Sequence, residues 1–450
     1  MKKWMSIVTS IVLMISLLSG CGGGSQTADQ NAAQKTETEV KSGTEIKTEL
    51  TFWVLSTDTE GVLNEYDRLV NDFSAKNPNI TIRKELVPSD KINEKISIAV
   101  NTNAMPDLQN GSAQWVLSYA QRNKLVPLDD LIEKTDYDEA LLNSLSVSGK
   151  LYVIPHTNNA IGLAVNRTAF KEANANDLLP KDSTETWSFD DFKKAAKAVT
   201  DPAKNRYGFG LYCGDTGGDQ MFHAMLWGFG AKSYSDDNMQ SVLNSPEAAE
   251  GLKFLISLQD EGLVPPGAVA LKGNDVISKM FPAGQVCMVM ANSGHMGQFR
   301  QTFKDGTNKE FELDLVAFPT KDGKSSNSVS FTSGYFIWNT ENQDKINASE
   351  EFIKFATDKE NMTKMAEQTG VISPLKSLAD KYKPDTDDGK VIPLFKYAGN
   401  VGIGVPGYSE IRPVLIQELQ AAFTKAKTPE KVLEDFQNKA NDIIKQQSAK

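Results

Sequence analysis

Strand and helix patterns alternate along the chain from residue 49. Residues 49–55, ELTFWVL, form a β-branched and aromatic run of strand length. Apolar residues then recur at helical spacing until Asn77-Pro78 ends the pattern: Leu63, Tyr66, Leu69, Val70 and Phe73. A second strand is predicted at 79–87 and a second helix at 91–104. This alternation predicts a layered α/β lobe with a largely parallel sheet.

The same pattern returns after residue 149. Strands are predicted at 150–155, 161–166 and 207–211, and an amphipathic helix at 189–200. A further helix follows Ser245, a suitable N-cap, with Pro246 at its first position and Gly262 at its end. Two α/β units without a long linker predict two lobes joined by strand crossings. Because ligands of such sheets bind at the carboxyl ends of strands, the function is expected between the lobes.

The first twenty residues have the layout of a signal peptide. Met1-Lys2-Lys3 precedes the uncharged apolar run 6–18, which is short for a spanning helix of roughly 20 residues. Leu18-Ser19-Gly20-Cys21 resembles the bacterial lipobox, which implies cleavage before Cys21 and a diacylglycerol on its thiol. A signal peptide is therefore expected at 1–20, and a transmembrane anchor is the less favoured alternative.

Residues 21–47 are predicted to be a flexible tether, because Val40 and Ile46 are the only large apolar residues there. The roughly 400 residues that follow exceed one ordinary core and favour two lobes.

The chain has a formal charge of -10, which becomes -12 when Lys2 and Lys3 leave with the signal peptide. Such an acidic chain without a basic stripe argues against nucleic-acid binding.

Metal and catalytic signatures are missing from the sequence. Cys213 and Cys287 lie in apolar surroundings that favour buried free thiols, with a disulfide as the alternative. The three histidines are far apart in sequence and predict no metal site: His156, His223 and His295. Residues 402–407 match G-x-G-x-x-G by letter, but no clear strand precedes them and Pro406 interrupts them. The chain is therefore predicted to be neither an enzyme nor a cofactor-binding protein.

Aromatic and amide residues cluster at predicted loop and strand ends. Such a mixture suits a neutral sugar, whose apolar faces stack on rings and whose hydroxyls need oriented partners. A core role for each tryptophan is the alternative, above all for Trp53 inside its strand, and Trp187 and Trp338 look structural. The set is Trp53, Trp115, Trp227, Tyr408, Asn110, Ser112, Asn158, Asn159, Asn292 and Ser293.

Ordered segments of the chain resemble extracellular solute-binding protein family 1, the carbohydrate-binding lipoproteins of ABC importers related to maltose-binding protein. The first is LTFWV, and AMPDLQNGSAQWVLSYAQRNKLVPLDDLI is similar to the family's proline-aspartate segment. VSGKLYVIPHTNNAIGLAVNRTAFKEA resembles its first strand crossing, KMFPAGQVCMVMANSGHM its ligand loop, and FTSGYFIW its return crossing. Residues 411–444 resemble the closing helices.

The resemblance implies a two-lobed periplasmic-binding-protein-like fold of type II, the Venus-flytrap fold, with a hinge of crossing strands. Lobe 1 is expected at 48–158 and 332–370, and lobe 2 at 159–331 and 371–450. The implied function is sugar or oligosaccharide binding by hinge closure and delivery to an ABC importer permease. A palmitate-bearing lipid anchor on Cys21 would hold a monomer outside the cytoplasm on the cell membrane, in a single-membrane bacterium.

The resemblance also implies a set of ligand positions. They are Thr57, Asp58, Asn110, Ser112, Trp115, Asn159, Asp215, Trp227, Asn292, Ser293, Ser333, Gly334 and Tyr408. Asp107 is expected to brace a loop, and His295 stands where relatives often carry an aromatic platform. Three alternatives stay open: a receptor for a phosphorylated or acidic solute, a lipid-anchored glycan hydrolase that would use carboxylates such as Asp58, Asp107 and Asp215, and a polymer-binding adhesin.

Overall fold

The computed structural model describes residues 47–55, 60–88, 91–113, 116–399, 401–402 and 404–448, without the side chains of residues 60, 140 and 331. The predicted signal peptide, Cys21 and almost all of the predicted tether lie outside these residues. Among the helices that are described, none is both long and apolar enough to cross a membrane.

A six-stranded mixed sheet organises the first part of the fold. Its main order is β12-β11-β3-β1-β2, and β6 pairs with β11. Strands β2 and β3 both run parallel to β1, whereas β11 runs antiparallel to β3 and β6. The strands are β1 (Thr48–Leu55), β2 (Ile80–Val87), β3 (Leu108–Ser112), β6 (Ile154–Ala160), β11 (Ser328–Ile337) and β12 (Ala398–Gly399).

Helices pack on this sheet through the apolar faces that their sequences predict. Tyr66, Leu69 and Phe73 of α1 are buried against the strand residues Leu50 and Phe52. The elements are α1 (Glu60–Lys76), α2 (Ile92–Thr102), α3 (Leu117–Ala120), α4 (Glu139–Ser144), α11 (Gln343–Ala356), α12 (Lys359–Thr369) and the hairpin β4 (Ser146–Val147) and β5 (Lys150–Leu151). The predicted strands at 49–55 and 79–87 and the predicted helices of this region are confirmed.

A second, four-stranded sheet has the order β10-β7-β9-β8. Only the β8–β9 pair is parallel, so this sheet is more mixed than a βαβ pattern would predict. Its strands are β7 (Gly162–Asn166), β8 (Tyr207–Phe209), β9 (Val286–Ala291) and β10 (Leu313–Val316). Nine helices that pack with it are α5 (Arg167–Glu172), α6 (Phe189–Val199), α7 (Asp219–Gly228), α8 (Pro246–Asp260), α9 (Gly273–Asp275), α10 (Ser293–Lys304), α13 (Asp387–Val391), α14 (Tyr408–Phe423) and α15 (Pro429–Ser448).

Helix α8 shows how local sequence sets an element's ends. The Ser245 hydroxyl accepts a hydrogen bond from the Ala248 N–H, and Pro246 occupies the first turn. Gly262 follows the helix with a φ of 70°, a left-handed conformation that glycine adopts without steric cost. The predicted N-cap, first residue and terminal glycine are therefore all confirmed.

Short turns of helix connect the larger elements. The 3-10 turns are η2 (Lys134–Asp136), η3 (Asn176–Leu178), η4 (Pro202–Lys204), η5 (Thr216–Gly218), η6 (Ala268–Ala270), η8 (Lys376–Lys381) and η9 (Ile392–Tyr397), and η7 (Val276–Met280) is a π-helical turn. Two of them, η8 and η9, lie in the last passage of the chain between the two sheets.

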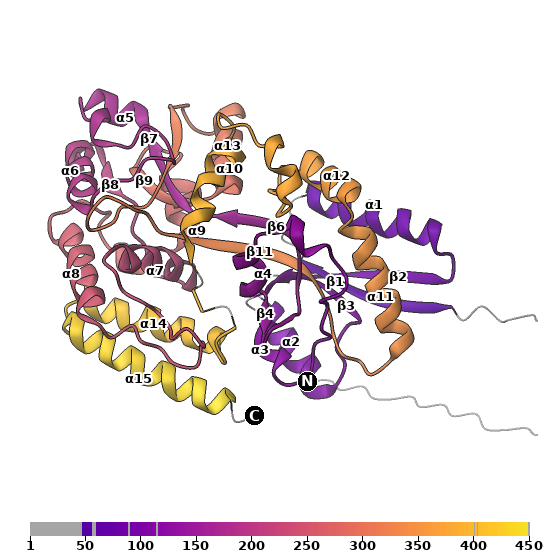
Figure 1. The fold of residues 1–450 in the computed structure, drawn as a ribbon. Helices are drawn as coiled ribbons and strands as arrows, with labels where there is room; N and C mark the ends of the chain where they lie inside the picture. Colours follow the sequence, from indigo (N-terminus) through magenta and orange to yellow (C-terminus); the bar gives the residue numbers. More distant parts are fainter. Residues whose placement is uncertain are drawn as a thin grey trace, which may run out of the picture. The chain divides into compact units, whose positions relative to one another are not determined.

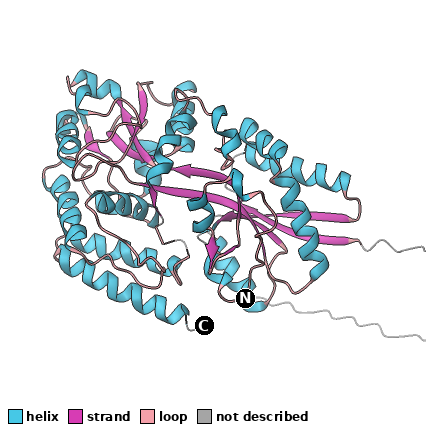
Figure 2. Cartoon of the chain, viewed as in Figure 1, coloured by secondary structure: helices cyan, strands magenta, loops and turns pink. Residues whose placement is uncertain are grey.

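The buried apolar residues form two separate clusters, which we call lobe 1 and lobe 2. Lobe 1 contains residues 50–154, 335–365 and 375–378, and lobe 2 contains residues 160–329, 372 and 391–444. Strands β6 and β11 each have one end in each cluster, and they run between the two groups of helices in Figures 1 and 2. The chain thus folds as an α/β protein whose two lobes are joined by crossing strands, and the predicted lobe boundaries at single residues stay predictions.

The crossing strands approach each other very closely at Gly334. A Cβ at this position would lie 2.4 Å from the carbonyl oxygen of Ile154, far inside van der Waals contact. The β6–β11 register also shifts between Ser333 and Gly334. Gly334, predicted to touch the ligand, therefore also has a packing role at the hinge.

The two cysteines that the structure describes are free and buried, as predicted. Cys213 and Cys287 are both 0% exposed, and burial raises the pKa of each thiol to about 12. Thiols held in the neutral form are poor nucleophiles, so these residues act as small apolar core residues.

Candidate functional site

The carboxyl ends of the parallel strands of both lobes lead to the strand crossing. In lobe 1, β1 and β3 are parallel and end at Leu55 and Ser112. In lobe 2, β8 and β9 are parallel, and Asn292 follows the end of β9. The end of β9 pairs with the start of β7, two residues beyond β6. The strand ends where ligands of such sheets bind therefore converge on the hinge.

A row of three hydroxyl side chains crosses the hinge. Ser333 of β11 is paired with Ser112 of β3 on one side and with Thr157 of β6 on the other. Residues directly opposite each other in a ladder share a face of the sheet. All three side chains are partly exposed. The predicted residues Ser112 and Ser333 are thus brought together, and Thr157 is a third member that the sequence prediction missed.

Asn159 continues this row towards lobe 2. It lies two residues after Thr157 and therefore on the same face of β6. Its side-chain N–H donates to the Ser293 hydroxyl at 3.0 Å. We call Ser112, Ser333, Thr157, Asn159 and Ser293 the polar row. It joins the predicted Asn159 and Ser293, and it spans both lobes and the crossing strands.

The first turn of α10 completes this edge of lobe 2. The Asn292 side chain accepts from the His295 N–H at 3.0 Å, and the His295 Nδ1 accepts from the Asn292 N–H at 3.3 Å. This capping box fixes both side chains at the helix start. Loss of hydration lowers the pKa of His295 to about 4, so the half-buried ring is neutral at pH 7. The centroids of the His295 and Phe299 rings are 6.4 Å apart, and the two ring planes form an angle of 17°.

Two predicted ligand residues, Asn110 and Tyr408, are buried inside the protein. Asn110 is 2% exposed and accepts from the Tyr66 hydroxyl at 2.9 Å while contacting His156. Tyr408 is 4% exposed, within the core of lobe 2. These two side chains do not present a surface to a ligand in this structure. The structure therefore provides no stacking platform at Tyr408, because the ring packs between Arg412 and Gly402.

Asp215 and Trp227 hold lobe 2 together next to the hinge. The Asp215 carboxylate accepts from the N–H groups of Gly217 and Gly273, each at 3.0 Å. The Trp227 ring covers Gly399, where a Cβ would lie 2.7 Å from the ring. Its indole N–H donates to the Ser233 hydroxyl at 2.8 Å. Both residues thus have structural roles, and each remains partly exposed.

The Ser233 hydroxyl also forms a hydrogen bond with His223. Indole N–H is only a donor, so Ser233 accepts from Trp227 and is left to donate to His223 Nδ1, 2.7 Å away. His223 is 2% exposed, and burial lowers its pKa to about 4. Its neutral imidazole is part of the core of lobe 2. Nothing in the sequence indicated that Trp227 belongs to this structural hydrogen-bond network rather than to a ligand site.

Thr57, Asp58 and Trp115, three further predicted ligand residues, lie outside the described residues. In sequence, Thr57 and Asp58 come two and three residues after the end of β1, and Trp115 comes three residues after Ser112. Asp107, predicted as a loop brace, is 5% exposed, accepts from the Thr51 N–H at 2.8 Å and pairs with Lys345 at 3.0 Å. That prediction is confirmed.

A buried ion pair lies in lobe 2, on helices α7 and α14. Asp219 is fully buried and accepts two hydrogen bonds from Arg412, whose Nη2 also donates to the Thr216 carbonyl at 2.9 Å. Burial opposes the charged guanidinium, but the Asp219 carboxylate outweighs it and raises the pKa of Arg412. The charge of this arginine is therefore neutralised within the protein.

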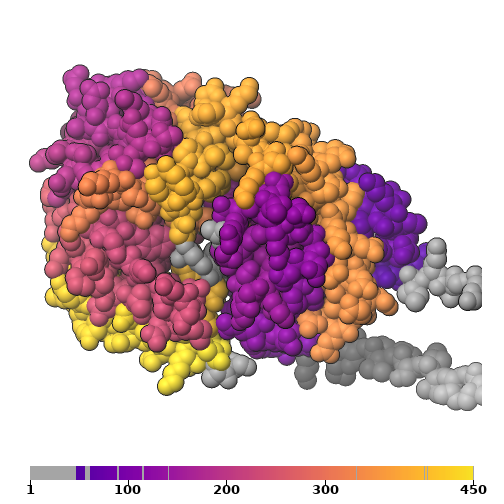
Figure 3. All heavy atoms as spheres, viewed as in Figure 1, coloured from indigo at the N-terminus to yellow at the C-terminus, as the bar shows by residue number. Residues whose placement is uncertain are grey.

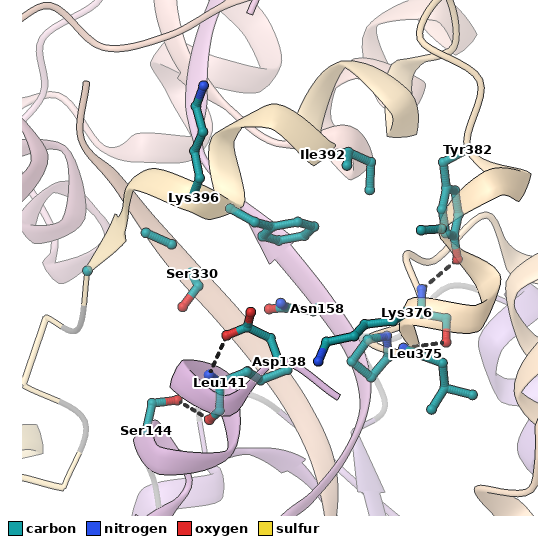
Figure 4. Close-up of a pocket in the computed structure, with 16 residues that line it drawn as sticks. Asp138, Leu141, Ser144, Asn158, Ser330, Leu375, Lys376, Tyr382, Ile392 and Lys396 are labelled. Atoms are coloured by element: carbon teal, nitrogen blue, oxygen red, sulfur yellow. Dashed lines mark hydrogen bonds between the residues drawn. The ribbon is translucent and has the colours of Figure 1, made fainter. Parts of the chain in front are cut away.

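A pocket of about 570 Å³ lies on the other side of the crossing strands (Figure 4). It contains Asn158 of β6 and Ser330 of β11, which alternate with the polar-row residues Asn159 and Ser333 along their strands. The orange-yellow segment with η8 and η9 borders the purple surface of lobe 1 (Figure 3). Among the described residues, no group of three His, Cys, Asp or Glu side chains is arranged to hold a metal ion.

Comparison with known proteins identifies relatives over most of the chain. The family described as bacterial extracellular solute-binding protein matches residues 68–391. A binding protein of Brucella abortus (strain 2308) is 24% identical over 386 residues, 84% of this chain and 90% of the relative. The sn-glycerol-3-phosphate-binding periplasmic protein UgpB of Escherichia coli (strain K12) is 22% identical over 438 residues, 88% and 93% of the two chains.

The fold is similar to that of solved binding proteins. A solute-binding protein of an ABC transporter from Thermotoga lettingae, crystallised with α-D-tagatose, has a TM-score of 0.74 at 19% identity. The alignment covers 88% of this chain and 100% of that one. At this level of identity the similarity establishes the two-lobed fold.

Proposed function

This chain belongs to the bacterial extracellular solute-binding protein family, and from that premise we propose that it captures a neutral sugar or oligosaccharide between its lobes for an ABC importer. The polar row carries this proposal. Its partly exposed hydroxyl and amide groups come from lobe 1 and the crossing strands, and the buried Ser293 of lobe 2 holds the Asn159 amide in place. Such exposed groups can both donate to and accept from sugar hydroxyls.

The charges near the site favour a neutral ligand over a phosphorylated one. A phosphate needs Arg or Lys groups whose charge is available. The polar row contains neither residue type, and Arg412 is already paired with the buried Asp219. A glycerol phosphate receptor is the second candidate, because UgpB, at 22% identity, is named as one.

The geometry suggests how binding would close the lobes. A ligand that contacts Ser112 and Ser293 touches both lobes, so it binds the closed state better than the open one. Moving a 1:99 mixture to 99:1 requires about 5.5 kcal/mol of preference for closure. Several hydrogen bonds of about 1 kcal/mol each, together with stacking, are sufficient for this.

The family implies a location outside the cytoplasm, and we propose a lipid anchor on Cys21 that keeps captured sugar near the permease. A diacylglyceryl group supplies two chains, which is enough for stable anchoring. Replacing Cys21 with serine is expected to release the protein into the medium, which immunoblotting of cell and medium fractions would measure.

The binding proposal is tested by calorimetric titration with a panel of mono- and oligosaccharides and with sn-glycerol 3-phosphate. We expect a sugar to bind and Asn159→Ala with Ser293→Ala to weaken it by about tenfold or more, from two lost hydrogen bonds. The control is Thr168→Ala, which removes a partly exposed hydroxyl on α5 and should leave the affinity for the sugar unchanged. Binding of glycerol phosphate alone would overturn the sugar assignment.

A further inference from the structure

The pocket on the Asn158 side of the hinge is built by three different parts of the chain. Its lobe 1 wall includes Asp138 and Leu141 of the α4 region, its lobe 2 wall includes Ile392 and Phe395 of η9, and Asn158 is part of the floor. At about 570 Å³ it falls within the range of roughly 300 to 1,000 Å³ that small-molecule sites occupy.

This pocket and the polar row lie on opposite faces of the same two strands. Successive side chains of a strand point to opposite faces. Asn158 and Asn159 are neighbours on β6, and Thr332 and Ser333 are neighbours on β11. The Thr332 hydroxyl donates to the Asn158 side chain at 3.1 Å, which places this pair on the pocket face. The pocket is therefore distinct from the proposed sugar site.

The pocket floor has hydrogen-bonding capacity that the described residues do not use. The Asn158 oxygen accepts from Thr332 and from the Asn159 N–H, so its amide N–H groups are left to donate. The Ser330 hydroxyl has no hydrogen bond to a described residue. Lys376, an exposed residue of the lining, has among the described residues one long contact, 3.4 Å, from its ammonium to the Thr135 carbonyl.

One acceptor faces these donors. Asp138 accepts from the Leu141 N–H at 3.2 Å, which fixes the carboxylate at the start of α4. In Figure 4 the ends of Asp138, Asn158 and Lys376 point towards one another. The segment that carries Lys376 is tied to lobe 1, because Ser377 donates twice to Asp136, at 2.8 and 2.6 Å.

The chemistry of this lining selects a class of ligand. The Asp138 carboxylate disfavours an anionic ligand and the Lys376 ammonium disfavours a cationic one. A ligand hydroxyl group can donate to the carboxylate or accept from the ammonium. The Phe395 ring and the Leu141 and Ile392 side chains give apolar walls that suit the C–H faces of a sugar or polyol. We propose that this pocket is a second binding site, for a neutral polyhydroxylated molecule of monosaccharide size.

Because its walls belong to different lobes, the occupied pocket is coupled to the hinge. A molecule bound there changes the free energy of lobe rotation, and any such effect on the polar row must be reciprocal. Only this coupling rests on the proposed sugar function. The site itself does not depend on it.

Calorimetry of the full mature chain with D-glucose, D-mannitol and maltose tests the second site. The wild type should show binding that the double variant Lys376→Met with Ser330→Ala weakens by at least about tenfold, from two lost hydrogen bonds. Lys381→Met, on the same turn but outside the pocket, is the matched control and should have no effect. Asn159→Ala should leave this class of binding in place.

Each outcome decides between the two sites. If only Asn159→Ala weakens binding, the second site is overturned and the sugar function stands. If only the pocket variants weaken binding, the second site is supported and the polar row is not the sugar site. If none of the three probes binds the wild type at 10 mM, the second site is refuted.

Discussion

The buried pair of Asp219 and Arg412 allows a sharp test of how lobe 2 is held in place. Replacing Asp219 with alanine removes both carboxylate acceptors, and among the described residues it leaves the Arg412 guanidinium with the Thr216 carbonyl as its hydrogen-bond acceptor. Arg412 belongs to α14 and Asp219 to α7, so the pair fastens α14 onto α7.

The size of the effect follows from burial. Asp219 is 0% exposed and the Arg412 side chain 17%, so water can replace the lost partner only in part. Breaking a buried pair by removing one member costs about 3–5 kcal/mol. The matched control is Glu250→Ala, whose partner Lys321 lies 2.7 Å away while both side chains are about half exposed. Such a surface pair contributes about 0–1 kcal/mol.

Urea unfolding followed by tryptophan fluorescence would measure the free energy of unfolding of both variants. Replacing both partners, Asp219→Leu with Arg412→Met, should be less destabilising than Asp219→Ala, because no unpaired charge is left in the core. A loss below about 1 kcal/mol for Asp219→Ala, equal to that of the surface control, would refute the claim that the pair is buried and that its charge is neutralised within the fold.

Three further predictions concern stability. Gly334→Ala should destabilise by about 1–3 kcal/mol through overpacking against the Ile154 carbonyl, whereas Gly297→Ala, with open space on helix α10, should be neutral or stabilising; equal unfolding midpoints would contradict this. Burial lowers the pKa of His156 to about 3 and of His223 to about 4, so the unfolded chain takes up protons first as pH falls below about 6.5. Stability should therefore be full above that pH and fall by about 2 kcal/mol per histidine by pH 5; a flat profile between pH 7 and 5 would exclude this. Tyr408→Ala should cost about 3 kcal/mol or more, as expected for a large buried side chain, and unchanged stability in thermal melts would show that the ring is not in the core.

Local patterns in the sequence predicted several elements of the fold, although the single strand predicted at 150–155 is two strands, β5 and β6, of which β6 extends to Ala160. The apolar spacing of α1, the Ser245 cap of α8 and the strand composition of β1 all act within a few residues, and each prediction is confirmed. Trp53 had two interpretations, a core residue or a ligand contact. It is 5% exposed and its indole N–H donates to Glu85, which fits the core role. Trp187 and Trp338 are buried, as their structural interpretation requires.

The roles of single polar residues could not be predicted in the same way. Asn110 and Tyr408 looked like surface groups at loop ends, but residues far away in sequence, Tyr66 and Arg412, determine their surroundings. Thr157 was missed because its position beside Ser333 depends on the register between strands that are more than 170 residues apart. Composition alone contains no information about that register.

The crossing strands explain why both proposed sites lie where they do. A rotation of the lobes would have to be absorbed where β6 and β11 pass between the clusters, around residues 157–160 and 330–334, and in the last passage of the chain, which carries η8 and η9. Gly334 and the register shift next to it bring the two strands very close together there, and both proposed sites use side chains of these same strands. A ligand on the polar row and a ligand in the Asn158 pocket would therefore act on the same rotation from opposite sides. The sign of their coupling follows from whether closing on one face widens or narrows the other.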